Sequence, residues 1–196
     1  MDIKCSVFIA ASVDGFIARP DGDIEWLHRP EYEEAELNGV TYEHFIATVD
    51  ALVMGRKTLE KVLSFPEWPY EGLPVIALSH QSVQLPAELK GKVEVVSQDV
   101  TRLVAALAER GMKHLYIDGG QTIQQFLEAG LIDEMIITRI PVVLGQGTPL
   151  FSQSGSGHGL RHIGISARMR RIMGLFKAGM RSVASTDARG PTPGNF

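Results

Sequence analysis

The sequence predicts an α/β fold with three layers, in which helices cover both faces of a mostly parallel central sheet. Short apolar runs that are typical of buried strands alternate along the chain with segments of helical period. The chain has 196 residues, of which 44% are hydrophobic, so it can bury one sizeable core. We therefore expect one globular domain over residues 1–165 and an atypical basic tail at residues 166–196.

The N-terminal half begins with a continuous apolar run at residues 5–11, which is typical of a central strand. A second short run at residues 16–18 leads into a flexible loop rich in turn residues. Residues 38–48 suit a helix. The remaining elements expected in this half are a buried strand at residues 51–54, a helix at residues 56–63 and a strand at residues 74–78.

The C-terminal half continues the alternation with a short strand at residues 93–96. Val100, Leu103, Val104 and Leu107 lie on one face of a helix that ends at Arg110. The expected elements after it are a strand at residues 114–117, a helix closed by Gly130 and an extended run at residues 132–143. Residues 152–159 and 190–196 have low complexity, so we expect a flexible loop and a disordered terminus there.

Composition excludes several classes of protein. Cys5 is the only cysteine, so no disulfide framework and no thiolate cluster for a metal is expected, and a reducing cytoplasm fits best. The N-terminus lacks a signal-peptide pattern, and the longest apolar runs have the length of strands rather than of membrane spans. We expect a soluble protein that binds neither a metal nor a membrane.

Two strand-to-helix turns have the chemistry of an anion site. At the first, Arg56 and Lys57 occupy the opening turn of a helix, where the helix dipole disfavours each positive charge by roughly 0.3–1 kcal/mol. A bound phosphate would reverse that effect, although an isolated pair of this kind is more often made of solvated surface charges. At the second, Gly119 and Gly120 lack Cβ atoms, so a diphosphate could approach the backbone; a tight turn explains them as well.

A third candidate lies at the end of the strand at residues 74–78. Leu78, Ser79 and His80 follow one another there, and a hydroxyl beside an imidazole suits a ribose phosphate. A plain polar loop is the alternative explanation. In an open α/β sheet all three places lie beyond the carboxyl ends of strands, which is where ligands bind.

Four motifs in this order resemble the reductase domain of bacterial riboflavin biosynthesis, which shares the dihydrofolate reductase fold. They are SVDGFIA at residues 12–18, LVMGRKT at residues 52–58, DGG at residues 118–120, and the segments LIDEM and PVVLGQGTPLF within residues 131–151. The resemblance covers residues 3–163 and does not include the usual partner deaminase domain. The chain is therefore identified as a stand-alone bacterial member, with a dihydrofolate reductase-like three-layer fold and a homodimeric assembly implied.

The resemblance implies an NADPH-dependent reductase that transfers a hydride to a small heterocyclic substrate of the pterin or ribosylaminopyrimidine type. It also implies four groups of cofactor-binding residues. They are Gly55, Arg56, Lys57 and Thr58 at the phosphates, Leu78, Ser79 and His80 at the adenosine end, Gly119, Gly120 and Thr122 at the diphosphate, and Ala11, Gly15 and Ile17 along the nicotinamide. On this basis Gly120→Val should weaken NADPH binding and leave the fold largely intact.

Asp14 is the only carboxylate in the loop that the resemblance places against the nicotinamide and substrate. As the catalytic candidate it would hydrogen-bond the substrate or help to deliver a proton. An Asp before a Gly is also a common turn residue, and both explanations remain open. Because the cofactor supplies the hydride chemistry, few titratable catalytic residues are needed.

Dihydrofolate reductases, which the chain resembles, carry a substrate-binding carboxylate on their first helix, one turn before a Phe. If Phe45 matches that Phe, the corresponding position here is Thr41. Pterin recognition then needs another carboxylate, and the sequence offers Glu25, Glu31 and Glu43. Acidic residues before or on an exposed helix are more often simply solvated.

The tail departs from the resemblance, in which the chain ends on an alternating apolar strand. Residues 168–181 are basic and roughly helical in period. A membrane-binding or nucleic-acid-binding helix is one explanation, but we expect neither partner. A frameshift is the other explanation. Some codon choices for residues 176–182, when they are read one nucleotide earlier, encode VQSRYEV, which is a strand-like sequence. Sequencing the last hundred or so nucleotides of the gene decides between a frameshift and a genuine variant.

Two other classes of function compete with a reductase. A nucleotide-binding protein without turnover would bind NADPH but would not oxidise it. An interaction protein that uses the basic tail would lose its partner, but keep its cofactor, on truncation after Ala167.

Overall fold

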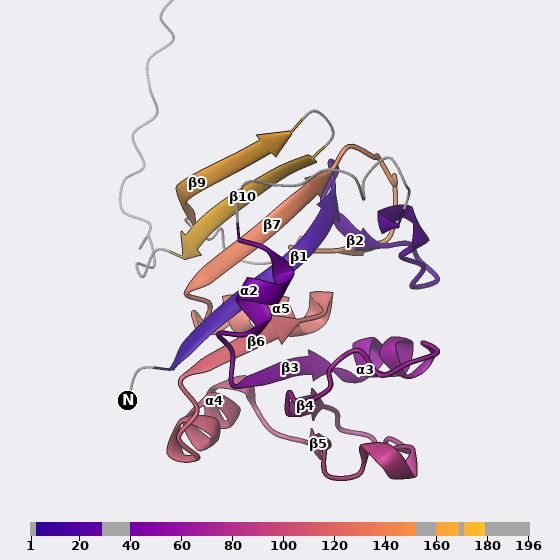
Figure 1. Cartoon of the computed structure of the whole chain (residues 1–196), viewed down its shortest axis with the longest axis vertical. Coiled ribbons are helices and arrows are strands. Elements are labelled where there is room, and N and C mark those ends of the chain that lie inside the picture. Colours follow the sequence, from indigo (N-terminus) through magenta and orange to yellow (C-terminus); the bar gives the residue numbers. More distant parts are fainter. Residues whose placement is uncertain (1–2, 29–39, 152–159, 169–170, 179–196) are drawn as a thin grey trace, which may run out of the picture.

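The computed structural model describes residues 3–28, 40–151, 160–168 and 171–178 (Figure 1). Ten strands lie within these residues. They are β1 (Lys4–Ser12), β2 (Phe16–Ala18), β3 (Ala51–Gly55), β4 (Val75–Leu78), β5 (Val93–Val96), β6 (His114–Asp118), β7 (Glu134–Ile140), β8 (Thr148–Pro149), β9 (Leu160–Arg168) and β10 (Arg171–Ala178). The expected strands are all present, and the extended run at residues 132–143 is paired only as β7.

Eight of the strands form one sheet, in the order β5-β4-β3-β6-β1-β7-β10-β9. Every neighbouring pair from β5 to β7 is parallel, whereas β10 runs antiparallel to both β7 and β9. The remaining strands, β2 and β8, form a separate antiparallel pair. The prediction of a mostly parallel central sheet is therefore confirmed.

Six short helices accompany the strands within the same described residues. They are the 3-10 turns η1 (Glu25–Leu27) and η2 (Ala87–Leu89) and the α-helices α2 (Tyr42–Ile46), α3 (Arg56–Leu63), α4 (Val100–Glu109) and α5 (Gly120–Glu128). The helix expected over residues 38–48 is shorter than predicted, because the Thr41 side chain accepts a hydrogen bond from the His44 N–H and so begins the helix at Tyr42.

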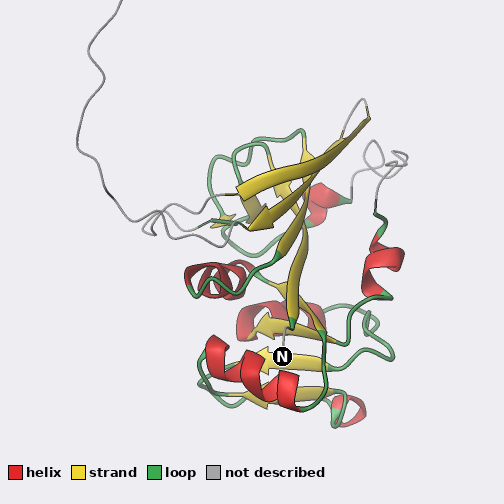
Figure 2. Ribbon diagram, turned by 90° about the vertical axis from the view of Figure 1, so that its left-hand side faces the viewer, coloured by secondary structure: helices red, strands yellow, loops and turns green. Residues whose placement is uncertain are grey.

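Helices cover both faces of the sheet (Figure 2). On one face α4 and α5 pack against the strands, with Leu107 and Phe126 fully buried in that layer. On the other face α2 and α3 pack through Phe45 and Leu59. Fully burying one such side chain contributes roughly 1.5–3 kcal/mol, so the two apolar layers hold the three-layer fold together.

Alternation along β6 shows how one strand serves both layers. Leu115 and Ile117 point into the layer beneath α4 and α5, whereas Tyr116 belongs to the layer beneath α2 and α3. Successive side chains of a strand point to opposite faces. Asp118, the last residue of β6, therefore lies on the same face as Tyr116.

The helical period expected for residues 168–181 is wrong where the structure describes that segment. Residues 171–178 form the strand β10, which pairs with β7 in a register that places Leu175 opposite Ile136. Sheet pairing overrides the local pattern here, because β10 supplies hydrogen bonds to the otherwise open edge of β7. The strand β9 crosses the expected domain boundary at residue 165, so the sheet extends into the basic tail.

The helices of the described residues are all too short to cross a membrane as an apolar span. The low-complexity segments at residues 152–159 and 190–196 lie outside the described residues.

Candidate functional site

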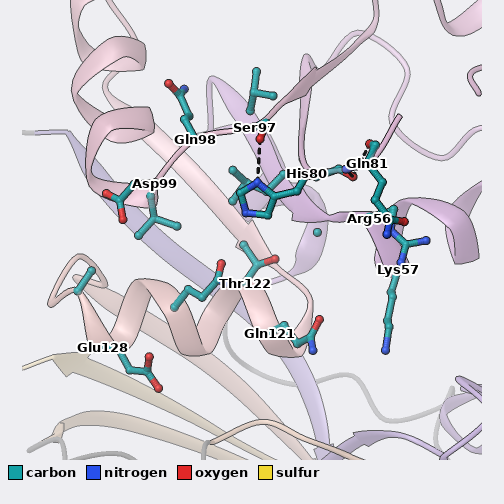
Figure 3. Close-up of a pocket in the computed structure, with 17 residues that line it drawn as sticks. Arg56, Lys57, His80, Gln81, Ser97, Gln98, Asp99, Gln121, Thr122 and Glu128 are labelled. Atoms are coloured by element: carbon teal, nitrogen blue, oxygen red, sulfur yellow. Dashed lines mark hydrogen bonds between the residues drawn. The ribbon is translucent and has the colours of Figure 1, made fainter. Parts of the chain in front are cut away.

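A cleft of about 700 Å³ lies at the carboxyl ends of β3, β4 and β5, where α3, α4 and α5 begin (Figure 3). Carboxyl ends of parallel strands meet at one edge of a sheet, so residues far apart in sequence converge there. Seven of the residues predicted to bind a cofactor line this cleft. They are Gly55, Arg56, Lys57, Leu78, Ser79, His80 and Thr122.

The helix starts around the sheet differ in how their backbone N–H groups are satisfied. Asp99 caps α4 through a hydrogen bond from the Thr101 N–H, as Thr41 caps α2. By contrast, α3 and α5 begin after Gly55 and Gly119 with no side-chain cap and no acidic residue in the first turn. Their first N–H groups thus remain available to an anion at the cleft.

Charges are arranged along the cleft from one end to the other. Figure 3 shows Arg56 and Lys57 at one end, His80 in the middle, and Asp99 and Glu128 at the other. An ion pair between Arg56 and Glu60 over 2.6 Å offsets part of the unfavourable interaction of Arg56 with the helix dipole. The exposed Lys57 contributes the second cation of this turn.

Hydrogen bonds fix the polar residues after β4. Ser79 Oγ donates to the Gln81 carbonyl over 2.7 Å and accepts from the Gln81 N–H over 3.1 Å. His80 Nδ1 lies 2.8 Å from Ser97 Oγ. The hydroxyl and the imidazole are therefore held at the middle of the cleft by the chain itself.

The two glycines before α5 have a packing reason that is independent of any ligand. Gly119 has a φ of 89°, and a Cβ added there would overlap the Thr58 hydroxyl. A Cβ on Gly120 would lie 2.8 Å from Thr148 Cγ2 and 3.2 Å from the Pro149 carbonyl oxygen. The expectation that Gly120→Val leaves the fold intact is therefore wrong, because the Thr148 and Ile17 side chains and the Pro149 carbonyl fill the space that the valine needs.

Ala11, Gly15 and Ile17 do not line the cleft, and Ile17 lies near this turn. Ala11 is buried at the end of β1, and the Gly15 carbonyl accepts from the Leu150 N–H. Ile17 Cδ1 lies 3.2 Å from the position of a Cβ on Gly120. Of the predicted nicotinamide residues, the structure thus brings Ile17 to the start of α5.

Asp14 joins two loops. Its carboxylate accepts from Ser12 Oγ over 2.6 Å, from the Gly145 N–H over 2.7 Å and from the Leu144 N–H over 3.2 Å. These bonds, led by that from Ser12, lower the pKa of Asp14 to about 2. The arrangement favours the structural explanation of Asp14, since the carboxylate stays ionised and ties the loop after β1 to the loop after β7.

The substrate carboxylates considered from the sequence do not form a site. Thr41 caps α2, and Phe45 packs against Phe8 and Tyr116 with ring centroids about 5 Å away. Glu25 and Glu43 are exposed. Glu31 lies outside the described residues.

Sequence reasoning missed Asp118 as a functional candidate. Burial raises its pKa to about 6, and a hydrogen bond from the Gly119 N–H opposes that rise. Its negative charge adds to the effect of burial in raising the pKa of Tyr42, Tyr70 and Tyr116. The sequence signal that could have identified it is a carboxylate at the last position of a buried strand. Because side chains alternate along a strand, this carboxylate points away from the cleft.

Residues suited to metal binding do not gather anywhere in the part of the chain that the structure describes. Cys5 is buried, and this burial raises the pKa of its thiol to about 12, so the thiol stays protonated.

The profile of the RibD C-terminal domain family matches residues 4–173, from the first strand into β10. The chain belongs to this family. Its membership confirms the resemblance carried by the four motifs, and the match runs beyond residue 163, where the resemblance was placed.

Relatives of this RibD C-terminal domain protein include YwjB, an uncharacterized protein of Bacillus subtilis strain 168. It is 36% identical over 156 residues, which cover 78% of this chain and 85% of YwjB. A Shewanella sp. PV-4 protein whose name assigns it provisionally to riboflavin biosynthesis has a solved structure with a TM-score of 0.81. It is 38% identical, and the match covers 90% of this chain and 99% of that one.

A more distant neighbour shows the fold alone. The Thermotoga maritima diaminohydroxyphosphoribosylaminopyrimidine deaminase/5-amino-6-(5-phosphoribosylamino)uracil reductase matches with a TM-score of 0.66 at 16% identity. The match covers 91% of this chain and 57% of the Thermotoga chain.

Proposed function

We propose that this protein is an NADPH-dependent reductase that transfers a hydride to a small heterocyclic substrate of the pterin or ribosylaminopyrimidine type. Family membership supports an oxidoreductase of the riboflavin-pathway type. The observation that carries the proposal is the cleft, where two helices without side-chain caps begin beside Lys57 and His80.

The residues of the cleft fit a dinucleotide. The free N–H groups of α3 and α5 would hold phosphates, Lys57 would add a positive charge, and Ser79 and His80 would lie against the adenosine end. When bound, the reduced nicotinamide supplies the hydride. The chain's own work is to orient the two rings and to exclude water from them.

Asp14 supports the reaction as a positioning residue in this proposal. Its hydrogen bonds to the backbone of Leu144 and Gly145 hold the loop that carries Gly15 and Ile17. That loop reaches the start of α5, where the nicotinamide end of a dinucleotide in the cleft would lie.

Lys57→Ala tests the cleft directly. Loss of one phosphate contact is expected to weaken NADPH binding roughly tenfold, about 1.4 kcal/mol, measured by titration with intrinsic Trp fluorescence. Lys61→Ala, in the last turn of the same helix, should leave the affinity unchanged. Wild-type protein that binds neither NADPH nor NADH would refute the proposed function.

A nucleotide-binding protein without turnover remains the second candidate, since the cleft accounts for binding but not for chemistry. NADPH oxidation assays with dihydrofolate and with the riboflavin-pathway ribosylaminopyrimidine, run side by side, separate the two. Oxidation with either substrate supports the reductase, and binding without oxidation of either supports the alternative.

The proposal includes a homodimer in the cytoplasm. Light scattering on the purified protein measures the assembly, and a mass of one chain would contradict the dimer.

A further inference from the structure

The strands β2 and β8 form a small antiparallel pair that lies against the first turn of α5. We call this pair the β2–β8 ribbon, and it comprises residues 16–18 and 148–149. A Cβ built on Gly120 would be 3.2 Å from Ile17 Cδ1, which belongs to β2. It would be 2.8 Å from Thr148 Cγ2 and 3.2 Å from the Pro149 carbonyl oxygen, which belong to β8. Both strands of the ribbon therefore approach the start of the helix closely.

Among the described residues, one side-chain hydrogen bond joins α5 to this ribbon. Gln124 Nε2 donates to the Pro149 carbonyl oxygen over 2.9 Å. Gln124 follows Gly120 by four positions, which is about one helical turn, so the two residues lie on the same face of α5. The Pro149 carbonyl thus faces two successive turns of the helix, and Gln124 is its donor there.

The cleft lies against the neighbouring face of the same helix. Gln121, Gln125 and Glu128 line the cleft, and Figure 3 shows Gln121 and Glu128 along this side of α5. Helix α5 therefore stands between the cleft and the ribbon. Its first N–H groups lack a side-chain cap, so a phosphate that they bind would have the cleft on one side and the ribbon on the other.

The remaining contacts of the ribbon leave its position on α5 to few groups. The two strands pair with each other, and the Leu150 N–H donates to the Gly15 carbonyl over 2.9 Å. These backbone bonds join the two loops but not the helix. Ile17 and Leu150 pack in the apolar layer that α5 also enters, and apolar packing has no fixed direction. The directional bond from Gln124 therefore sets where the ribbon sits on the helix.

We propose that Gln124 is a positioning residue of the reductase. By donating to the Pro149 carbonyl, it holds the β2–β8 ribbon, and Ile17 with it, against the nicotinamide end of the dinucleotide. This inference rests on the proposed function, because it assigns a role toward the same cofactor. Gln124 acts on the nicotinamide half of that cofactor and not on the adenosine half, which lies in the cleft along the other face of α5.

Calorimetric titration of the full-length protein with two ligands tests this role. NADPH contains both halves of the dinucleotide, whereas adenosine 2′,5′-bisphosphate contains only the adenosine half. Gln124→Met keeps the length of the side chain and removes the donor. The variant should bind NADPH roughly threefold to tenfold more weakly, which is the effect of one hydrogen bond, and should bind the bisphosphate within about twofold of the wild type. A purely structural role would weaken both ligands by the same factor.

Two further variants give the matched comparisons. Gln124→Glu places a carboxylate against the Pro149 carbonyl oxygen, and repulsion between the two should lower NADPH affinity at least as much as Gln124→Met does. Gln125→Met removes the same amide one position further along the helix, on the side of the cleft. It should leave the ratio of the two affinities within about twofold of the wild-type ratio. A thermal melt shows whether each variant is folded.

Hydrogen exchange in the absence of ligand adds a second readout. Mass spectrometry follows the peptides that cover residues 15–18 and 148–150. Exchange in both peptides should be at least about threefold faster in Gln124→Met, because the ribbon leaves the helix more often, and should be unchanged in Gln125→Met. Peptides from β7 serve as the internal reference, since that strand should exchange alike in all variants.

Three results would overturn the inference. They are an equal loss of affinity for both ligands in Gln124→Met, an unchanged NADPH affinity in Gln124→Met, and ribbon exchange that is the same in Gln124→Met as in the wild type. Failure of the proposed function gives a different result. A wild type that does not bind NADPH refutes the reductase, and the role of Gln124 toward the cofactor with it, before any variant is compared.

Discussion

The two faces of the sheet offer opposite chemistry at the same edge. The cleft at the starts of α3, α4 and α5 is open, polar and lined by free helix N–H groups and by the cations of α3. On the side of α2, the Asp118 carboxyl has no cation among the described residues that opposes the effect of burial. An open polar cleft and a buried acidic group thus lie at the same edge of the sheet, and the glycine turn at the start of α5 joins them.

The glycine turn that joins the two regions should be the place where a substitution lowers the unfolding free energy most. Gly119→Ala combines a φ of 89°, which costs a non-glycine residue roughly 1–2 kcal/mol, with an overlap on the Thr58 hydroxyl that costs roughly 1–3 kcal/mol. We expect a loss of about 2–4 kcal/mol in unfolding free energy, measured by urea denaturation.

Gly130→Ala is the matched control for that substitution. Its φ is 67°, but the space around it is open, so a loss of about 1 kcal/mol is expected. Thr58→Ala in the Gly119→Ala background should recover part of the larger loss. Equal losses at Gly119 and Gly130 would contradict the packing explanation.

The second prediction concerns the cost of burying the Asp118 carboxyl. The native pKa of Asp118 is raised to about 6 from 3.8, so its contribution is full below pH 4 and is lost as pH rises through 6. Asp118→Asn should therefore stabilise the fold at pH 7–8, by an amount on the order of 2 kcal/mol, and should make little difference at pH 4. Urea denaturation at both pH values measures this, and a variant destabilised at pH 8 would show that Asp118 already has a partner.

The smallest effect is expected at Asp14, which ties the loop after β1 to the loop after β7. Asp14→Asn keeps part of the bonding to Ser12, Leu144 and Gly145, so we expect NADPH affinity to fall by roughly threefold to tenfold with the fold retained. Because the pKa of Asp14 is about 2, the pH profile of NADPH oxidation between pH 5 and 9 should not change shape. A variant that loses one limb of that profile would restore Asp14 as a proton donor.

Residues of the cleft were predictable because turn chemistry is local. Gly55, Arg56 and Lys57 adjoin in sequence, so their place at a helix start follows from the strand-to-helix pattern alone. The same reasoning reached Ser79 and His80, since each follows a strand whose carboxyl end opens onto the cleft.

Predictions from local sequence patterns were wrong where contacts with distant segments decide the structure. Residues 171–178 have a roughly helical period, yet they form β10 because β7 presents an edge that needs a partner. Gly119 and Gly120 suggested room for a ligand, but Thr58 and Thr148 from other elements occupy that room. The sequence left a catalytic and a turn role open for Asp14, and the N–H groups donated by the loop after β7 favour the structural one.

The sequence by itself determined the fold class, the family and the helix starts that suit phosphates, because these depend on period, composition and adjacent residues. Only the tertiary structure decided which side chains share a face of the sheet. Asp118 and Tyr70 are 48 positions apart in the sequence, and they meet because β6 and the segment before β4 belong to one packed layer. Packing between distant segments, rather than any local motif, therefore decides the surroundings of Asp118.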